Sequence, residues 1–235
     1  MISVKSYQNL VRTSYSPKDA IILLKDLTND MKELSTKERE KLIQSGVHYS
    51  EMLPAEKAPS QQYMDLYNEA MRVKKDEIAH GIAKISEMAM LKTGYISSGD
   101  KSKTPIIVSL ARAGIPVGVL MKRYIESRYS IDCPHYAISI IRDKGIDYNA
   151  MNFIYENECK FSERGVENII FVDGWTGKGM IMRQLQEAVS DLKARDSKWE
   201  NLSDELFVLA DPANITEYCG TRADYMLPSD KQVHS

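Results

Sequence analysis

The sequence has no long apolar run and no excess of basic charge. No window of the 235 residues approaches the roughly 18 apolar residues of a membrane-spanning helix, and residues 1–13 lack the apolar core of a signal peptide. Lys and Arg number 31 against 33 Asp and Glu, so a net charge of -2 offers no general field for a nucleic-acid backbone. We expect a cytoplasmic globular protein with no membrane partner and no strong nucleic-acid signal.

Cysteine is scarce, and no residues are spaced like metal ligands. Cys133, Cys159 and Cys219 are far apart, odd in number and without a CxxC pair, which is typical of reduced thiols. The four histidines also lack the spacing of a zinc site. The sequence therefore predicts neither a disulfide framework nor a zinc site.

The pattern of apolar residues changes along the chain, and this change predicts two regions. Between Ser16 and Thr93 apolar residues fall at helical spacing, for example Ile21, Leu24 and Leu27, so residues 1–96 are expected to form a helical N-terminal region or hood. Ser35 followed by Glu38 has the spacing of a capping box, which predicts a helix over residues 36–44. Residues 97–235 are expected to form an α/β core with a C-terminal tail.

In the core, short β-rich runs alternate with amphipathic helices. Each run is apolar on both faces, as strands inside a parallel sheet must be. Strand and helix alternation predicts a doubly wound parallel sheet, whose ligands bind beyond the carboxyl ends of the strands. The predicted strands are 106–110, 136–141, 169–172 and 206–209, and the predicted helices are 115–128 and 179–195.

A phosphate-binding loop is predicted after the third of these strands. Its residues are Asp173, Gly174, Trp175, Thr176, Gly177, Lys178 and Gly179, and an amphipathic helix follows. Glycines let backbone N–H groups turn inward, a hydroxyl adds a donor, and a helix N-terminus attracts anions. Asp173, at the strand's end, is suited to accept hydrogen bonds from sugar hydroxyls or to help hold Mg²⁺. The alternative is a glycine-rich turn without a ligand.

Other glycine loops do not fit the spacing. A Walker A loop needs GxxxxGK[ST], but here Gly174 and Gly177 flank two residues, and Lys178 is followed by Gly179 instead of a hydroxyl residue. The dinucleotide pattern GxGxxG is absent from this loop as well. A sugar phosphate remains the best-fitting ligand.

A second anion-binding turn is predicted after the first strand. Ala111, Arg112, Ala113 and Gly114 lie between that strand and the next helix. Arg112 can direct two N–H groups at one phosphate, and Gly114 permits close approach of the backbone. A salt bridge beside a tight turn is the alternative.

The segments after the other two strands supply weaker candidates. Arg142 and Lys144 lie in a polar segment, 142–147, that is suited to close over a reaction and neutralise a departing anion. A solvated charged loop explains the same pattern. Asp211 follows the last strand, where a base or acceptor would approach, and Arg222 is a further candidate there.

The loop 173–179 resembles the phosphoribosyl pyrophosphate motif of type I phosphoribosyltransferases, and the turn 111–114 is similar to their pyrophosphate turn. The resemblance implies that fold, Mg²⁺ as cofactor, and phosphoribosyl pyrophosphate or a nucleoside monophosphate as ligand. It also implies catalytic roles for Arg112, Asp173, Arg142 and Lys144, with Asp173 near the metal. The usual motif has two adjacent acids, whereas this chain has only Asp173.

A narrower resemblance covers nearly the whole chain. Segments 48–54, 109–114, 173–179 and 220–222 are similar to the phosphoribosyltransferase-like proteins encoded with bacterial tellurium-resistance and stress genes, some of which are labelled cysteine protease StiP. Members usually continue into a Pelota-like RNA-binding domain, which this chain would lack. A cysteine nucleophile needs a nearby histidine, and only Cys133 with His135 is close in sequence.

Two functions follow as expectations. The first is transfer of phosphoribose to a base or related acceptor, with release of pyrophosphate. The second is a catalytically silent nucleotide-binding or sugar-phosphate-binding regulatory protein, suggested by the single acid. A protease is a weaker third, and a homo-oligomer is compatible with all three.

Overall fold

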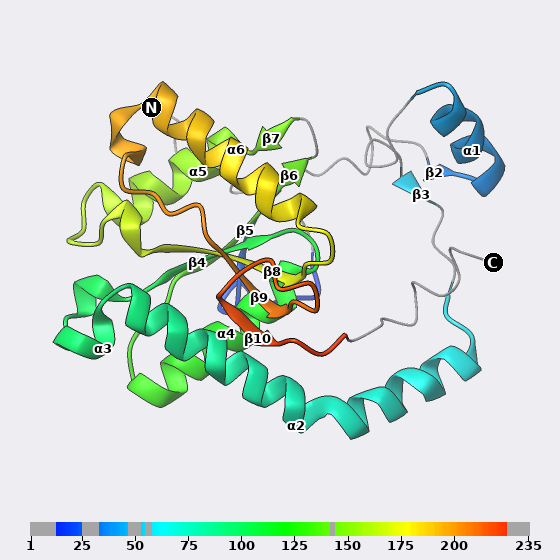
Figure 1. The fold of residues 1–235 in the computed structure, drawn as a ribbon, viewed down its shortest axis with the longest axis horizontal. Coiled ribbons are helices and arrows are strands. Elements are labelled where there is room, and N and C mark those ends of the chain that lie inside the picture. The colour runs from blue at the N-terminus through cyan, green and yellow to red at the C-terminus, as the bar shows by residue number, and fades with distance from the viewer. Residues whose placement is uncertain (1–12, 25–32, 47–52, 55–57, 142–143, 225–235) are drawn as a thin grey trace. The chain divides into compact units, whose positions relative to one another are not determined.

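The computed structural model describes residues 13–24, 33–46, 53–54, 58–141 and 144–224 (Figure 1). Contacts divide the chain into two compact units, Lys25–Lys75 and the remainder. The larger unit contains all of the predicted core strands. Within the described residues, no helix has both the length and the apolar character that a membrane span requires.

A six-stranded parallel sheet forms the centre of the larger unit, in the order β1-β5-β4-β8-β9-β10 (Figure 1). Because all six strands are parallel, their carboxyl ends meet at one edge of the sheet. β4 and β8 are neighbours, with Ile106 opposite Ile169 and Ser109 opposite Val172. The strands are β1 (Ile21–Leu23), β4 (Ile106–Leu110), β5 (His135–Ile138), β8 (Ile169–Trp175), β9 (Leu206–Ala210) and β10 (Cys219–Thr221).

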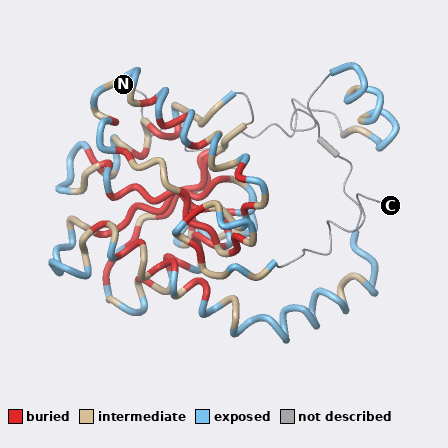
Figure 2. The backbone as a smooth tube through the Cα atoms, in the orientation of Figure 1, coloured by how far each residue is buried: buried red, intermediate tan, exposed pale blue. Residues whose placement is uncertain are grey.

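Helices cover both faces of this sheet. On one face lie α5 (Tyr148–Ile154) and α6 (Met180–Arg195), and on the other lie α4 (Gly114–Tyr129) and the C-terminal part of α2 (Gln61–Lys92) (Figure 1). Alternate residues of β8 serve the two cores: Phe171 packs in the cluster with α6, and Ile170 packs in the cluster with α4 and α2. Buried residues accordingly concentrate along the strands (Figure 2). The predicted doubly wound α/β fold is confirmed.

The smaller unit contains α1 (Thr36–Gln44) and a short parallel pair, β2 (Glu33–Leu34) and β3 (Leu53–Pro54). The predicted capping box is present: the Ser35 N–H donates to Glu38 Oε2 at 2.8 Å, and the Glu38 N–H donates to Ser35 Oγ at 3.4 Å. A helical N-terminal region is thus confirmed. The remaining elements are α3 (Tyr95–Ser98), β6 (Ile140–Ile141), β7 (Gly145–Ile146), the 3₁₀ turns Lys101–Lys103, Val166–Asn168 and Ser197–Trp199, and a π-turn, Tyr155–Cys159.

Three details of the sequence prediction were wrong. Ile21 belongs to strand β1, which pairs with β5, because a short apolar run fits a buried strand as well as a helix. Leu27, from the same predicted stripe, lies outside the described residues. The strand expected over 136–141 is broken at Ser139 into β5 and β6, and β6 pairs antiparallel with β7. β8 runs three residues further than expected, so Asp173, Gly174 and Trp175 are strand residues.

Candidate functional site

The two predicted loops touch each other at the carboxyl edge of the sheet. A Cβ added to Gly114, at the start of α4, would lie 2.3 Å from the Val172 carbonyl oxygen. A Cβ added to Gly174 would lie 2.9 Å from the Ala113 carbonyl oxygen. Only glycine allows backbones to approach this closely. The structure therefore brings the turn after β4 and the end of β8 into one surface.

Asp173 is the acidic group of this surface. The Gly174 N–H donates to its Oδ1 at 2.7 Å. Burial raises the pKa of Asp173 to about 6, and the Gly174 N–H only partly offsets that rise. A carboxylate held in this way is suited to accept hydrogen bonds from hydroxyl groups of a ligand.

Metal binding by protein groups alone has little support at this edge. Within the described part of the chain, no three His, Cys, Asp or Glu side chains cluster in a way that could hold a metal ion. Mg²⁺ is commonly held by one or two carboxylates together with phosphate oxygens and water. Asp173 fits that sparse mode, with the ligand supplying the other oxygens.

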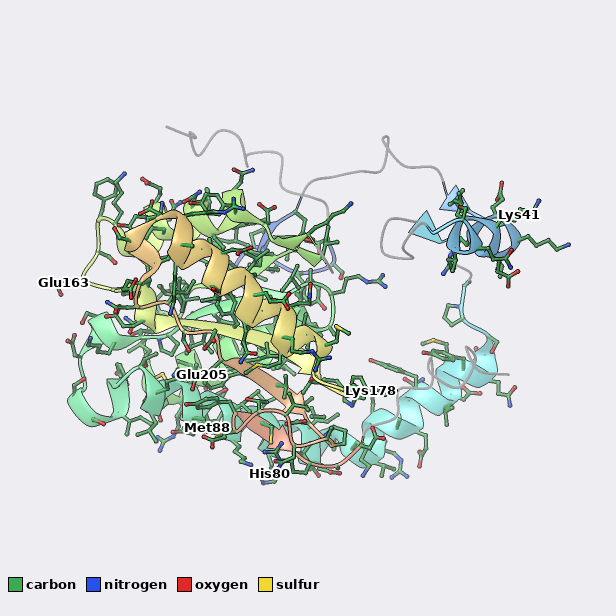
Figure 3. All side chains as sticks on the ribbon, turned by 45° about the horizontal axis from the view of Figure 1, so that its top comes forward. Lys41, His80, Met88, Glu163, Lys178 and Glu205 are labelled. Carbon is green, nitrogen blue, oxygen red and sulfur yellow. The ribbon has the colours of Figure 1, made fainter. Side chains whose placement is uncertain are left out.

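The loop from Thr176 to Gly179 links β8 to α6, and Lys178 lies at that helix's N-terminal end (Figure 3). The Thr176 N–H donates to the Ala210 carbonyl at 3.1 Å, so it continues the sheet and does not point into the loop. Its hydroxyl is different: Thr176 Oγ1 is buried and has no hydrogen-bond partner among the described residues. A buried polar group without a partner is costly, which makes this hydroxyl a candidate ligand donor.

The start of α6 has the geometry of an anion site. Gly179 is its N-cap with φ of +74°, a conformation that favours glycine, and no side chain caps the helix there. The helix is 16 residues long, so its N-terminus presents a partial positive charge. Uncapped N–H groups at the start of such a helix can hold a phosphate group.

Asp211 supports this loop from behind. It is fully buried, and its Oδ2 accepts the N–H groups of Ile215 at 2.7 Å and Thr216 at 2.9 Å, as well as a hydrogen bond from Arg222. The Ile215 side chain in turn lies 3.2 Å from the position of a Cβ on Gly179. Asp211 thus fixes the backbone around Ile215 and Thr216, the segment that packs against the loop 176–179. A direct ligand contact of Asp211 stays a prediction.

The other predicted site residues are placed as follows. The Arg112 side chain is exposed in the turn after β4, where the Ala111–Arg112 peptide bond is cis. Lys144 is exposed in the turn between β6 and β7, which occupies the segment predicted as a mobile cover. Arg142 lies outside the described residues.

Sequence reasoning missed a buried polar chain beneath the turn after β4. Ser109 Oγ lies 2.9 Å from the Gly114 carbonyl and 2.7 Å from His135 Nε2, and His135 Nδ1 lies 2.7 Å from the Asp19 carbonyl. Gly118 of α4 makes room, because a Cβ there would lie 2.2 Å from Ser109 Oγ. Burial lowers the pKa of His135 to about 4. The sequence signal that could have revealed this chain is a polar residue inside each of two apolar strands, Ser109 in β4 and His135 in β5.

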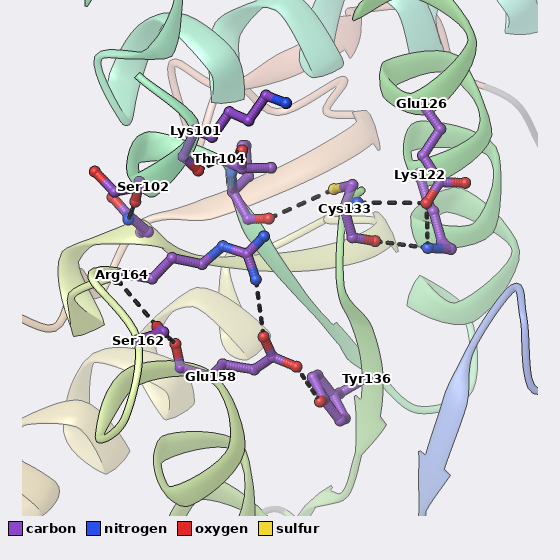
Figure 4. Close-up of polar contacts among 12 residues, drawn as sticks. Lys101, Ser102, Thr104, Lys122, Glu126, Cys133, Tyr136, Glu158, Ser162 and Arg164 are labelled. Atoms are coloured by element: carbon purple, nitrogen blue, oxygen red, sulfur yellow. Dashed lines mark hydrogen bonds and ion pairs between the residues drawn. The ribbon is translucent and has the colours of Figure 1, made fainter. Parts of the chain in front are cut away.

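No cysteine is placed for nucleophilic catalysis. All three cysteines are buried, and the Cys133 thiol donates to the Pro105 carbonyl at 3.5 Å (Figure 4). Burial raises the pKa of Cys133 and of Cys159 to about 12, the opposite of an activated thiol. His135, the neighbour of Cys133 in sequence, contacts Ser109 and Asp19 through its two ring nitrogens. Protease chemistry therefore finds no support in the thiols of this chain.

A separate cavity of about 430 Å³ lies near the amino ends of β1 and β5. Its polar groups are largely engaged with one another: Lys122 Nζ donates to the Cys133 carbonyl at 2.7 Å and pairs with Glu126, and Glu158 pairs with Arg164 at 3.0 Å (Figure 4). Ligands of open α/β sheets bind at the opposite end of the strands. The two touching loops remain the better site.

Solved structures with a related arrangement include the hypoxanthine phosphoribosyltransferase from Trypanosoma cruzi in complex with the product IMP. It is 10% identical, with 64% of this chain and 73% of that chain covered and a TM-score of 0.41. A hypothetical protein from Neisseria gonorrhoeae with bound ppGpp is 13% identical, with 62% and 78% covered and a TM-score of 0.35. Likeness at this level carries no functional weight, and the fold assignment rests on the sheet itself.

Sequence comparison is more decisive. A curated relative, the "Cysteine protease StiP" of Acinetobacter baylyi (strain ATCC 33305 / BD413 / ADP1), is 33% identical over 217 residues, which are 92% of this chain and 51% of the relative. The chain thus spans about half the length of that relative. The family described as "Tellurite-like stress resistance cysteine protease StiP" matches residues 13–231. Because that match covers most of the sequence, the chain belongs to the StiP family of tellurite-like stress resistance proteins.

Proposed function

We propose that the chain binds phosphoribosyl pyrophosphate at the carboxyl edge of its sheet and transfers phosphoribose to a base or related acceptor. The observation that carries this proposal is the direct backbone contact between the two loops, Gly114 on Val172 and Gly174 on Ala113. That contact places the turn 111–114 against the end of β8, directly before the loop 176–179, and so supports binding of one sugar that carries phosphate groups at both ends. The family's protease label is not adopted, because the thiols are buried.

Each loop takes one part of the ligand in this proposal. The Thr176 hydroxyl and the N-terminus of α6 hold the 5-phosphate. Asp173 accepts hydrogen bonds from the ribose hydroxyls. The turn from Ala111 to Gly114 holds the pyrophosphate through its backbone and through the Arg112 guanidinium.

The reaction is a displacement at C1 of the ribose. A nitrogen of the base forms a bond to C1 while the C1–O bond to pyrophosphate breaks. The leaving group keeps the bonding electrons, and the nitrogen loses its proton to the solvent. Arg112 stabilises the growing negative charge, and closure of the β6–β7 segment with Lys144 and Arg142 would exclude water. Mg²⁺ would supply further neutralisation of the leaving group's charge, and Asp173 is the residue that would hold it.

A second candidate function is binding without catalysis. The structure offers a physical reason for the missing second acid, since any side chain on Gly174 would collide with Ala113. The site therefore keeps one carboxylate where the related motif has two. A nucleotide-binding or sugar-phosphate-binding regulatory protein needs no more than this.

Pyrophosphate release separates the two functions. The purified chain, incubated with Mg²⁺, phosphoribosyl pyrophosphate and each common base, should release pyrophosphate if it is a transferase. Binding of phosphoribosyl pyrophosphate by calorimetry without any release would favour the silent protein. Absence of both binding and release would contradict the whole proposal.

The two-loop arrangement makes a sharper prediction for Arg112→Ala. A charged hydrogen bond to phosphate is worth about 1.5–3 kcal/mol, so the variant should bind phosphoribosyl pyrophosphate about one to two decades more weakly. Ribose 5-phosphate, which lacks the pyrophosphate, should bind the variant and the parent equally in calorimetry. Equal weakening of both ligands would mean that Arg112 acts on the fold or on the 5-phosphate, and would contradict the arrangement.

A further inference from the structure

We propose that Trp175 is the stacking surface for the aromatic ring of the acceptor base, and so the residue that makes this site prefer nucleobase ligands over sugar phosphates alone. The inference rests on the proposed function, because it places a ring beside the ribose and the 5-phosphate. It assigns a role to a side chain that the loop's phosphate chemistry does not use.

Trp175 is the exposed end of a buried strand. The residues of β8 from Ile169 to Val172 are at most 1% exposed, whereas Trp175 is 46% exposed. A single exposed apolar side chain is ordinary, so exposure alone does not indicate a binding role, and such a role depends on where Trp175 lies. Side chains two apart on a strand share a face and stand about 7 Å apart, so Trp175 lies on the face of Asp173, one step nearer the phosphate loop.

The indole ring is held in place by the loop itself. A Cβ added to Gly177 would lie 2.2 Å from Trp175 Cη2, so the ring lies directly against the Gly177 backbone. β8 also keeps its register to this point, with Trp175 paired to Ala210 of β9. A ring fixed before binding loses little conformational entropy when a planar ligand stacks on it.

The neighbours of the ring indicate which ligand it would meet. The Asp173 carboxylate lies on the same face, and the next residue, Thr176, has a buried hydroxyl without a described partner. A nucleoside monophosphate is the ligand class that presents hydroxyls, a phosphate and a flat aromatic ring within one sugar's span. Stacking on an aromatic side chain tolerates any base, because every base has a π-face.

Tryptophan fluorescence tests this inference directly. The chain has two tryptophans, and the other, Trp199, is fully buried against Tyr155. Titration with adenosine, guanosine, cytidine and uridine monophosphates should change the emission of Trp175, whereas ribose 5-phosphate should change it little. Trp175→Phe should abolish the change but retain most of the affinity measured by calorimetry.

Trp175→Ala should weaken the best-binding monophosphate roughly tenfold to a hundredfold and leave ribose 5-phosphate within about twofold. Phe161→Ala is the matched control, because Phe161 is 83% exposed and lies in the same turn as Glu163, far from Lys178 in Figure 3. Ribose 5-phosphate binding with unchanged nucleotide affinity in Trp175→Ala would overturn this inference alone. Failure of the parent chain to bind any of these phosphates would overturn the proposed function, and this inference with it.

Discussion

At the residue scale, the buried carboxylate of Asp173 lowers the stability of the native state when it is ionised. Its pKa is raised from 3.8 to about 6 by burial, so the native state holds a proton more tightly than the unfolded chain does. Between pH 4 and pH 6 stability therefore increases as the pH falls, and above pH 6 the ionised carboxylate is destabilising. Such a cost is typical of functional groups, whose positions are selected for chemistry instead of stability.

Asp173→Asn should therefore stabilise the protein above pH 6 while it abolishes sugar-phosphate binding. At 1.36 kcal/mol per pKa unit, the gain is at most roughly 3 kcal/mol at pH 8, and it should disappear below pH 4. Urea unfolding at pH 8 and at pH 4 measures it, and calorimetry with ribose 5-phosphate measures binding.

The exposed Asp191 of α6 supplies the control for this prediction. Asp191→Asn should change neither stability nor binding appreciably. Asp173→Asn with full ligand affinity would contradict the role of Asp173, whatever happened to stability.

From the sequence alone, a site residue could be predicted where its role depends on residues next to it in the chain. Asp173, Gly114 and Thr176 could be predicted as site residues because strand, loop and helix follow one another locally. The partners of Asp211 and His135 were not found, because Arg222 and Ser109 reach them only through the folded sheet. Spacing along the chain carries no information about such contacts.

At the scale of elements, the apolar runs were the reliable signal. β4, β9, α4 and α6 agree with prediction to within one or two residues, because their patterns are long or apolar on both faces. β1 was missed because a run of three apolar residues fits the periodicity of a helix as well as that of a strand. β8 was cut short because Asp-Gly is typical of a turn, whereas here strand pairing with β9 continues to Trp175.

The segment from Asp211 to Arg222 makes a prediction for Asp211→Asn. Losing the charge that faces Arg222 should lower the free energy of unfolding by about 1–3 kcal/mol. Because Ile215 packs against Gly179, the 5-phosphate should also bind severalfold more weakly. Denaturant unfolding and calorimetry with ribose 5-phosphate measure the two effects.

Arg222→Lys is the companion variant. It keeps the charge but loses the 2.8 Å hydrogen bond from Nη2 to the Thr216 carbonyl, so a smaller version of both effects is expected. If Asp211→Asn lost binding with unchanged stability, Asp211 would act on the ligand directly and the supporting role assigned to it would be wrong.

At the scale of the whole molecule, the two cores bury every thiol. Cys159 and Cys219 pack in the core under α5 and α6, and Cys133 packs in the core under α4. Each single change to Ala should leave ligand binding and any pyrophosphate release within about twofold, and should cost about 0.5–3 kcal/mol of stability.

Thiol labelling under native conditions offers an independent check. All three thiols should react only as fast as the protein opens, because burial hides them. A preparation that hydrolyses peptides and loses that activity on one Cys→Ala change would restore the protease interpretation for this chain.

The Ser109 hydroxyl has one hydrogen and two acceptors. His135 Nδ1 faces the Asp19 carbonyl, which can only accept, so in the neutral ring Nε2 also needs a donor. Ser109 can donate to Nε2 or to the Gly114 carbonyl, but not to both at once. The one hydroxyl hydrogen of Ser109 can therefore serve either the turn proposed to receive pyrophosphate or the His135 ring, and a change that removes one of these acceptors frees it for the other.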